Sequence, residues 1–347
     1  MSKAISPPAS SRSETEIPPE PPARLHEPSR FWEALGAEHH LDLEAFGPER
    51  VKRHQALRYF TWRWRVSTLR SSEQFRFLVR HTSPATLATC AAAPSDLSDR
   101  AWHGVSWPRR ERWLYTFAVR LLWEYARRHD RLGLTRIEEP SLGDPLPVRW
   151  RGRLISQDLA NSALECSAMA HALDGRQPAT ILEIGGGYGR LGHALLSAFP
   201  SAAYTIVDIE PARTISEWYL SRLFPDRDLR FLTPQQAVDL PSCSASLALS
   251  VSSLQEMTPV QVDGYLALLD RVAAGGVVYL KQWAEWRNPT DGCTVRFDDY
   301  PIPSRWHACF DEAAPVQMGF RQAAWAVPGE TGRTLSEPAP RRGGWRP

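Results

Sequence analysis

The chain has 347 residues, of which 43% are hydrophobic and 23% charged, the balance of a soluble globular protein. Its formal net charge of +2 neither favours nor excludes a polyanionic partner. No apolar run reaches the roughly 18 residues that a membrane helix needs, and the amino terminus lacks the apolar core of a signal peptide. We therefore expect a cytoplasmic protein with no membrane partner. The five cysteines lie far apart without a C-x-x-C pair, so we expect buried thiols and no zinc site.

Four segments follow one another along the chain. Residues 1–30 hold seven prolines among Ser, Glu and Arg, a composition that predicts a disordered arm. Residues 31–150 are rich in Trp and Arg and are patterned as helices, which indicates an accessory helical region. From 151 to 327 strands and helices alternate, which is typical of a parallel sheet covered on both faces. Residues 328–347 resemble the first segment in composition and are predicted to form a disordered tail.

Basic and aromatic residues are interleaved within the helical region. They are Arg50, Lys52, Arg53, Arg58, Arg63, Arg65, Arg70, Arg76 and Arg80, with Tyr59, Phe60, Trp62, Trp64, Phe75 and Phe77. Such a pattern can bind nucleic acid or an anionic small molecule such as a nucleotide-linked sugar. It also occurs in amphipathic helices whose aromatic residues pack inward. We favour the interpretation as amphipathic helices, and we do not expect nucleic acid to be a partner.

The clearest helix of this region follows Pro108. Large apolar residues recur every four positions at Trp113, Phe117, Leu121 and Tyr125, beside Leu114, Ala118 and Leu122. This stripe predicts a core helix that packs against the following domain.

The domain that follows is expected to hold at least five strands. They are 180–184, 204–208, 229–232, 246–251 and 276–282, and helices are predicted at 188–199, 211–223 and 259–273. Ligands bind at the carboxyl ends of parallel strands in such sheets. We therefore expect one crevice ringed by Gly185, Asp208, Thr233–Gln236, Ser252–Met257 and Lys281–Trp283.

A glycine-rich turn joins the first of these strands to the next helix. Gly185, Gly187 and Gly189 alternate, so the backbone can take positive φ angles and a ligand can approach the main chain. Asp208 ends the next strand, where a carboxylate could accept the hydroxyls of a ribose. The sequence Gly187-x-Gly189-x-x-Gly192 also fits the dinucleotide-binding pattern. In that pattern the first glycine directly follows the strand, whereas in this chain Gly185 directly follows it and Gly187 comes two residues later. The plainest alternative is a turn that merely joins strand to helix.

The order of Glu183, Gly185, Gly187 and Gly189, with Asp208 at the end of the next strand, resembles motif I of class I S-adenosyl-L-methionine-dependent methyltransferases. The resemblance implies a Rossmann-like α/β fold in which the loop cradles the methionine moiety of the cofactor. These five residues are then the expected cofactor contacts.

Several further segments resemble a narrower group, the sugar O-methyltransferase family of bacterial glycan and natural-product clusters. The likeness spans roughly residues 137–325, and its segments are Ile155–Glu165 (ISQDLANSALE), Ile181–Leu191, Ile206–Pro211, Ser252–Met257 (SSLQEM) and Tyr279–Trp283. It implies methylation of a hydroxyl on a sugar or glycosylated metabolite, which would be the small-molecule partner. The alternatives are an NAD-dependent oxidoreductase and a catalytically silent regulatory protein that binds the cofactor.

Transfer of a methyl group to an alcohol benefits from a base that removes the hydroxyl proton. His307, which follows the last predicted strand, and Glu256, in the Gln-Glu-Met segment, are the two expected catalytic residues, and both should reach the crevice. Asp158 is more simply a helix cap, and His193 a solvated residue of the cofactor helix. Lys281 could orient a phosphate or carboxylate, or simply be solvated. No dense group of His and carboxylate residues requires a metal.

Overall fold

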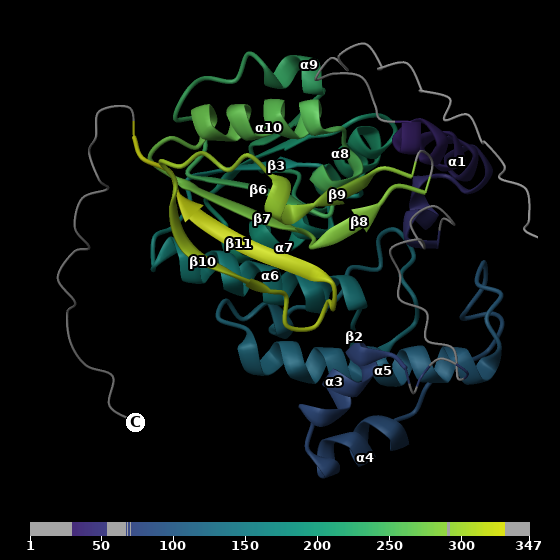
Figure 1. Ribbon diagram of the computed structural model, residues 1–347. Coiled ribbons are helices and arrows are strands. Elements are labelled where there is room, and N and C mark those ends of the chain that lie inside the picture. The colour runs from purple at the N-terminus through teal and green to yellow at the C-terminus, as the bar shows by residue number, and fades with distance from the viewer. Residues whose placement is uncertain (1–29, 54–66, 68, 70, 290–291, 330–347) are drawn as a thin grey trace, which may run out of the picture.

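The computed structural model describes residues 30–53, 67, 69, 71–289 and 292–329 (Figure 1). The predicted arm and tail lie outside the described residues, except for Arg30 and residues 328–329. The first part of the described chain is helical and consists of α1 (Arg30–Phe46), η1 (Pro48–Arg53), α3 (Glu73–Arg80), α4 (Pro84–Ala92), α5 (Arg109–His129) and η3 (Leu134–Arg136). None of the helices in these ranges is long and apolar enough to cross a membrane.

A seven-stranded sheet forms the centre of the second part. Its strands are β3 (Thr180–Ile184), β4 (Ala203–Val207), β5 (Leu229–Leu232), β6 (Leu247–Val251), β7 (Val277–Trp283), β10 (His307–Ala313) and β11 (Phe320–Ala326). They lie in the order β10-β11-β7-β6-β3-β4-β5, and β11 is antiparallel to both neighbours. The five predicted strands are confirmed to within a residue at each end, whereas β10 and β11 were not predicted.

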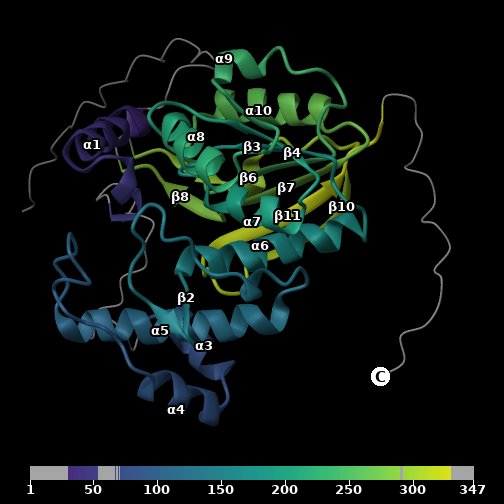
Figure 2. The same cartoon turned by 180° about the vertical axis from the view of Figure 1, so that it is seen from behind.

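Helices cover both faces of this sheet, as Figures 1 and 2 show. One face packs on α6 (Gln157–Leu173), α7 (Arg190–Ala198) and α8 (Ala212–Leu223), and the other on α9 (Pro234–Ala237) and α10 (Pro259–Val272). The predicted Rossmann-like class I methyltransferase fold is confirmed by the strand order and by the antiparallel strand β11. The classic dinucleotide-binding sheet is mostly parallel and has six strands in the order 3-2-1-4-5-6, whereas this sheet has seven strands and its strand β11 is antiparallel to both neighbours.

Parallel pairing fixes where the loops meet. Ile184 of β3 lies opposite Val207 of β4, and Ser250 of β6 lies opposite the same Ile184. The residues that follow these strands, including Gly185 and Asp208, therefore emerge side by side at the carboxyl edge. Two small hairpins, β1 (Arg149–Trp150) with β2 (Arg153–Leu154) and β8 (Glu285–Arg287) with β9 (Thr294–Arg296), lie outside the main sheet.

Helix α5 is the core helix that the apolar stripe predicted. Leu114, Ala118, Leu121 and Leu122 are buried in a cluster that continues into α6 through Leu159 and its neighbours. The prediction was wrong for Trp113, the first residue of the stripe, which is 39% exposed.

The basic and aromatic stretch divides between surface and interior. Residues 54–66, 68 and 70 lie outside the described residues. In α3 the aromatic Phe75 and Phe77 pack on the core while Arg76 is exposed, as expected of an amphipathic helix. Lys52 and Arg53 depart from this pattern because both side chains are buried. Among the cysteines, Cys90 and Cys166 are buried as expected, whereas Cys243, Cys293 and Cys309 are exposed.

Arg120 on α5 is a buried arginine that holds the helical region together. Only 1% of its surface is exposed, and its guanidinium donates to the carbonyl oxygens of Cys90, Ala93 and Pro94 at the end of α4 and of Arg149 in β1. One side chain thus satisfies the backbone acceptors of two neighbouring segments.

We expect Arg120→Met to lower the free energy of unfolding by about 3 kcal/mol or more, because several buried carbonyls would lose their donor at once. Arg110→Met is the control, since Arg110 is an exposed arginine of the same helix. Urea unfolding of both variants measures the difference. Equal stability of the two variants would contradict the structural role of Arg120.

Candidate active site

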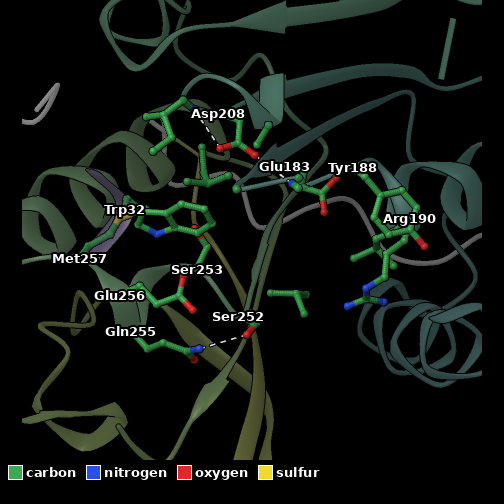
Figure 3. Close-up of a pocket in the computed structure, with 18 of the residues that line it drawn as sticks. Trp32, Glu183, Tyr188, Arg190, Asp208, Ser252, Ser253, Gln255, Glu256 and Met257 are labelled. Atoms are coloured by element: carbon green, nitrogen blue, oxygen red, sulfur yellow. Dashed lines mark hydrogen bonds between the residues drawn. The ribbon is translucent and has the colours of Figure 1, made fainter. Parts of the chain in front are cut away.

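A cavity of about 520 Å³ opens at the carboxyl edge of the sheet. Its lining takes residues from all five segments that the sequence placed there, among them Gly185, Asp208, Pro234, Glu256 and Trp283. Figure 3 shows Asp208 and Glu183 above Trp32 in the view, with Glu256 and Gln255 below it and Tyr188 and Arg190 to the other side. The expected single crevice is thus present.

The three alternating glycines have different structural roles. All have positive φ, at +77° for Gly185, +57° for Gly187 and +91° for Gly189. A Cβ at Gly185 would lie 2.1 Å from the Ser253 hydroxyl, and one at Gly189 would lie 2.9 Å from Leu220, so these two are required by packing. A Cβ at Gly187 would meet nothing within 4 Å, and this residue lines the cavity. Only Gly187 therefore leaves the open approach that a ligand of this loop needs.

Two buried carboxyls stand behind the loop. Asp208 accepts the backbone N–H of Gly187 at 2.9 Å and that of Ile209 at 2.8 Å, and Glu183 accepts the hydroxyl of Tyr204 at 2.7 Å. Burial raises the pKa of each group to about 7, although these hydrogen bonds oppose the shift. Both residues line the cavity, but Glu183 also has a packing role within the sheet.

The Gln-Glu-Met segment forms the opposite wall as a short turn, η4 (Leu254–Glu256). Ser252, just before it, has a φ of +57°, a strained backbone for a residue with a side chain. The Gln255 amide donates to the Ser252 hydroxyl at 3.0 Å and accepts from the backbone N–H of Trp283 at 2.8 Å. Gln282 accepts the backbone N–H of Ser253 at 3.0 Å. Two glutamines thus fix the turn against β7.

Glu256 is the most perturbed carboxyl in this wall. It is 2% exposed, and burial raises its pKa to about 8, while hydrogen bonds from Gln255 and Trp32 act in the opposite direction. A carboxyl with a pKa close to neutral and a place in the cavity wall is suited to proton transfer.

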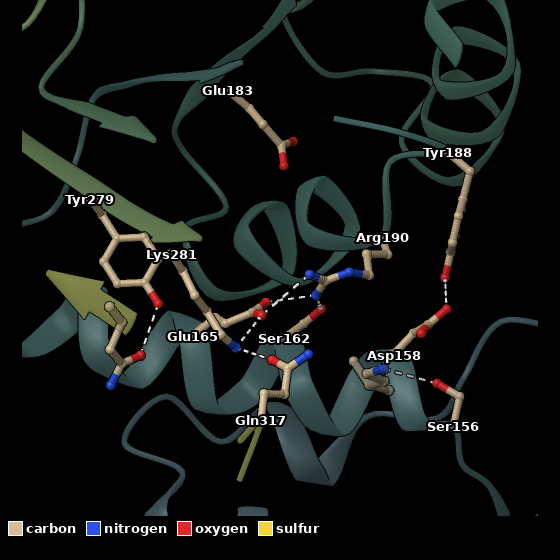
Figure 4. A network of polar contacts seen from close by, with 12 residues as sticks. Ser156, Asp158, Ser162, Glu165, Glu183, Tyr188, Arg190, Tyr279, Lys281 and Gln317 are labelled. Atoms are coloured by element: carbon tan, nitrogen blue, oxygen red, sulfur yellow. Dashed lines mark hydrogen bonds and ion pairs between the residues drawn. The ribbon is translucent and has the colours of Figure 1, made fainter. Parts of the chain in front are cut away.

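The Ser-Gln-Asp-Leu-Ala-Asn-Ser segment forms the start of α6 and contacts the cofactor loop (Figure 4). Ser156 caps the helix, with its hydroxyl accepting the N–H of Leu159 at 2.9 Å. Asp158, which was expected to be the cap, instead accepts the hydroxyl of Tyr188 at 2.6 Å. Asp158 lines the cavity, and burial raises its pKa.

About two turns after Asp158 along α6, Glu165 binds two cations. Arg190, the first residue of α7, donates to it at 2.6 Å, and Lys281 on β7 donates to it at 2.8 Å. The expectation that Lys281 is solvated is therefore wrong, since the residue is 4% exposed. Its ammonium does meet a carboxylate, but that carboxylate belongs to the protein.

The structure does not bring His307 and Glu256 together. His307 begins β10 and pairs with Ala326, which in turn pairs with Val277 at the amino end of β7. It is exposed at the edge of the sheet opposite to the cavity. The prediction that it reaches the crevice was wrong because the unpredicted strand β10 begins at that edge, so that Ala313 at its end, and not His307, lies level with the carboxyl end of β7. His193 is not solvated either, for it is 8% exposed and burial lowers its pKa to about 4.

Much of the cavity wall comes from residues that no motif indicated. They are Trp32 and His39 of α1, Lys52 of η1, Trp286 of β8, Gln317 and Phe320. Lys52 donates to the hydroxyl of Tyr219 at 2.9 Å, pairs with Glu139 and lies 5.6 Å from the ring centroid of Tyr188. Within the described ranges no group of three or more His, Cys, Asp or Glu side chains is arranged to hold a metal ion.

Comparison with known proteins gives only distant likenesses. No family model matches the chain, and no curated protein does. Solved structures that resemble it include a SAM dependent methyltransferase from Aquifex aeolicus, with 14% identity over 43% of this chain and 81% of that one, and a TM-score of 0.34. The [4+2]-cyclase SpnF has 12% identity over 52% of this chain and 85% of its own, with a TM-score of 0.42. A candidate sarcosine dimethylglycine methyltransferase from Galdieria sulphuraria has 18% identity over 37% of this chain, a TM-score of 0.32, and only 48% of its length covered.

The burial of Glu256 predicts a dependence of stability on pH. Because its pKa is raised from 4.5 to about 8 in the folded protein, its contribution is fully present below about pH 4.5 and is lost as the pH rises through about 8. We therefore expect Glu256→Gln to lose less stability than wild type over this interval. Urea unfolding at a series of pH values measures it, with the exposed Glu217→Gln as control. Parallel curves for Glu256→Gln and wild type would show that the carboxyl is not buried as described.

Proposed function

We propose that the protein is an S-adenosyl-L-methionine-dependent O-methyltransferase that acts on a hydroxyl of a sugar or glycosylated metabolite. One observation carries the proposal. A single cavity holds a glycine loop with open space over Gly187 at one wall and a buried carboxyl with a pKa of about 8, Glu256, at another. A cofactor cradle and a candidate base thus share one enclosed volume.

The residues at the loop fit this cofactor. The open approach to Gly187 admits the methionine part, and Asp208 at the end of β4 is placed for the ribose hydroxyls. The Asp208 carboxylate accepts backbone N–H groups from Gly187, Ile209 and Gly186, and the roughly four acceptor sites of a carboxylate leave room for a further donor. The other expected contacts support the loop. Glu183 accepts the hydroxyl of Tyr204, while Gly185 and Gly189 pack so closely that a side chain at either position would disturb the loop.

When bound, the cofactor supplies a methyl group on a positively charged sulfonium. The protein's own part is to hold the acceptor hydroxyl in line and to take its proton. Glu256 is the base in this proposal, and its carboxylate form accepts that proton as the new carbon–oxygen bond forms. Gln255 and Trp32 orient the carboxyl by hydrogen bonding. Alignment of the two reactants in the cavity contributes much of the rate.

Aromatic side chains define the rest of the acceptor space. Trp32, Trp283, Trp286 and Phe320 line the cavity, and Trp283 and Phe320 pack with ring centroids 4.5 Å apart. Flat apolar faces can pack on the C–H face of a sugar ring while polar groups nearby bind its hydroxyls. Gln255, Asn161 and Gln317 supply such polar groups in the same wall.

We expect Gly187→Val to abolish binding of S-adenosyl-L-methionine, because the branched side chain would fill the only open approach to the loop. Asp208→Ala should weaken binding by about 1.5 to 3 kcal/mol, as expected for lost hydrogen bonds to a charged group. Isothermal titration calorimetry with the cofactor measures both affinities. Gly175→Val is the control, since Gly175 also has a positive φ and open space around its Cα, but lies outside the cavity. Wild-type affinity in a folded Gly187→Val protein would refute the loop assignment.

Glu256→Gln should lower turnover by roughly 10²-fold or more while cofactor affinity stays near wild type. In the wild type kcat/KM should rise with pH through about 8, because the base works only as the carboxylate, and this limb should vanish in the variant. Release of S-adenosylhomocysteine with a panel of hexoses, glycosides and nucleotide-linked sugars gives the rates, with Glu217→Gln as control. If the limb persists in Glu256→Gln, another group removes the proton.

A further inference from the structure

A second cavity, of about 360 Å³, lies on the other side of α6 from the glycine loop. Asn161 and Gln317 line both cavities, so the two are separated by a thin wall of amide side chains. No sequence motif predicted a second cavity, although Asn161 and Lys281 in its lining belong to the segments Ile155–Glu165 and Tyr279–Trp283.

Cations outnumber carboxylates among the residues that line the second cavity. Arg128 and Arg131 lie at its exposed rim, and the buried Lys281 lies in its wall, against a single carboxylate, Asp130. The Asp130 oxygens are already occupied, because they accept the N–H of Leu132 at 3.1 Å and both donors of Thr135 at 2.7 and 2.8 Å. Asp130 is thus turned toward its own loop.

The cations of this cavity are not fully compensated by the protein. Lys281 shares Glu165 with Arg190, so one carboxylate pairs with two cations, the buried Lys281 and the half-buried Arg190. The guanidinium of Arg131 forms no hydrogen bond or ion pair within the described part of the chain, and only its backbone N–H is bound, to Ser167 at 3.0 Å. An anion in the cavity would supply the missing charge.

The wall also holds an unused polar atom. Asn161 is 4% exposed, and its side-chain oxygen has no hydrogen-bond partner among the described residues. A buried acceptor left without a donor is costly and is commonly satisfied by a ligand or water. A hydroxyl group passing between the two cavities would satisfy it.

We propose that the second cavity binds an anionic group, a phosphate or carboxylate, carried by the acceptor whose sugar ring lies in the first cavity. Arg128, Arg131 and Lys281 bind the anion, and Asn161 accepts a hydrogen bond from an adjacent hydroxyl. The substrate class is therefore an acidic or phosphorylated sugar. That this sugar is methylated rests on the proposed function, whereas binding of the anion does not.

Binding of inorganic phosphate to the full chain tests the anion site without any methyl transfer. Calorimetric titration at constant ionic strength should show saturable binding, and Arg131→Gln should weaken it by about tenfold or more, as expected for a lost charge-assisted hydrogen bond. Arg230→Gln is the matched control, because Arg230 is an exposed arginine on the distant edge strand β5. Absence of saturable binding, or equal affinities in the two variants, would overturn the proposal.

Sugar phosphates test whether the anion belongs to the acceptor. Glucose 1-phosphate, glucose 6-phosphate or UDP-glucose should bind more tightly than inorganic phosphate, and Asn161→Ala should remove that gain while leaving phosphate affinity unchanged. If no sugar phosphate binds more tightly than phosphate, the site takes a free anion and the acceptor assignment fails. If the wild-type protein binds S-adenosyl-L-methionine but not phosphate, the anion site is refuted and the proposed function stands. If it binds phosphate but not S-adenosyl-L-methionine, the proposed function is refuted and the anion site stands.

Discussion

One buried carboxylate, Glu165, connects the three elements that meet behind the glycine loop. It comes from α6 and binds the first residue of α7 and a lysine of β7. Such an ion cluster is costly to remove from water, and loss of the carboxylate would leave the buried Lys281 and the half-buried Arg190 without their shared partner. The position of the glycine loop relative to the sheet therefore depends on α6, a helix that precedes the sheet in sequence.

The same helix explains why two cavities lie so close together. Its first turns carry Asp158 and Asn161 toward the cofactor loop, while the next turn carries Glu165 toward β7. A helix has neighbours on every side, so a segment of only a few residues can form the wall of two cavities. Several buried polar residues of α6 have partners on neighbouring segments: Ser162 and Glu165 bind Arg190, and Ser167 accepts the backbone N–H of Arg131.

The sequence was most informative where local pattern and topology agree. Strands β3 to β7 are short and apolar, and each is followed by a turn, so both their positions and the crevice at their carboxyl ends could be predicted. Strand β11 was missed because its Ala323, Ala324 and Ala326 are weak β-formers. Strand β10 was missed because it lies at an edge and is largely exposed, which removes the apolar pattern. Because β10 was missed, His307 was expected at the carboxyl ends of the strands, whereas it lies level with the amino end of β7. Trp32 and Lys52 could not have been assigned to the cavity at all, since their place depends on long-range packing that no spacing encodes.

Trp32 reaches the cavity from α1, more than 150 positions before the loop that holds its opposite wall. The cofactor loop, the strand acids and Glu256 all come from the sheet domain, whereas this indole belongs to the helical part. Trp32 lines the proposed acceptor space together with Trp283, Trp286 and Phe320, which come from the later part of the chain. Two distant stretches of sequence therefore shape one cavity, so a substitution in α1 can change the form of that cavity while the glycine loop and the strands keep their sequence.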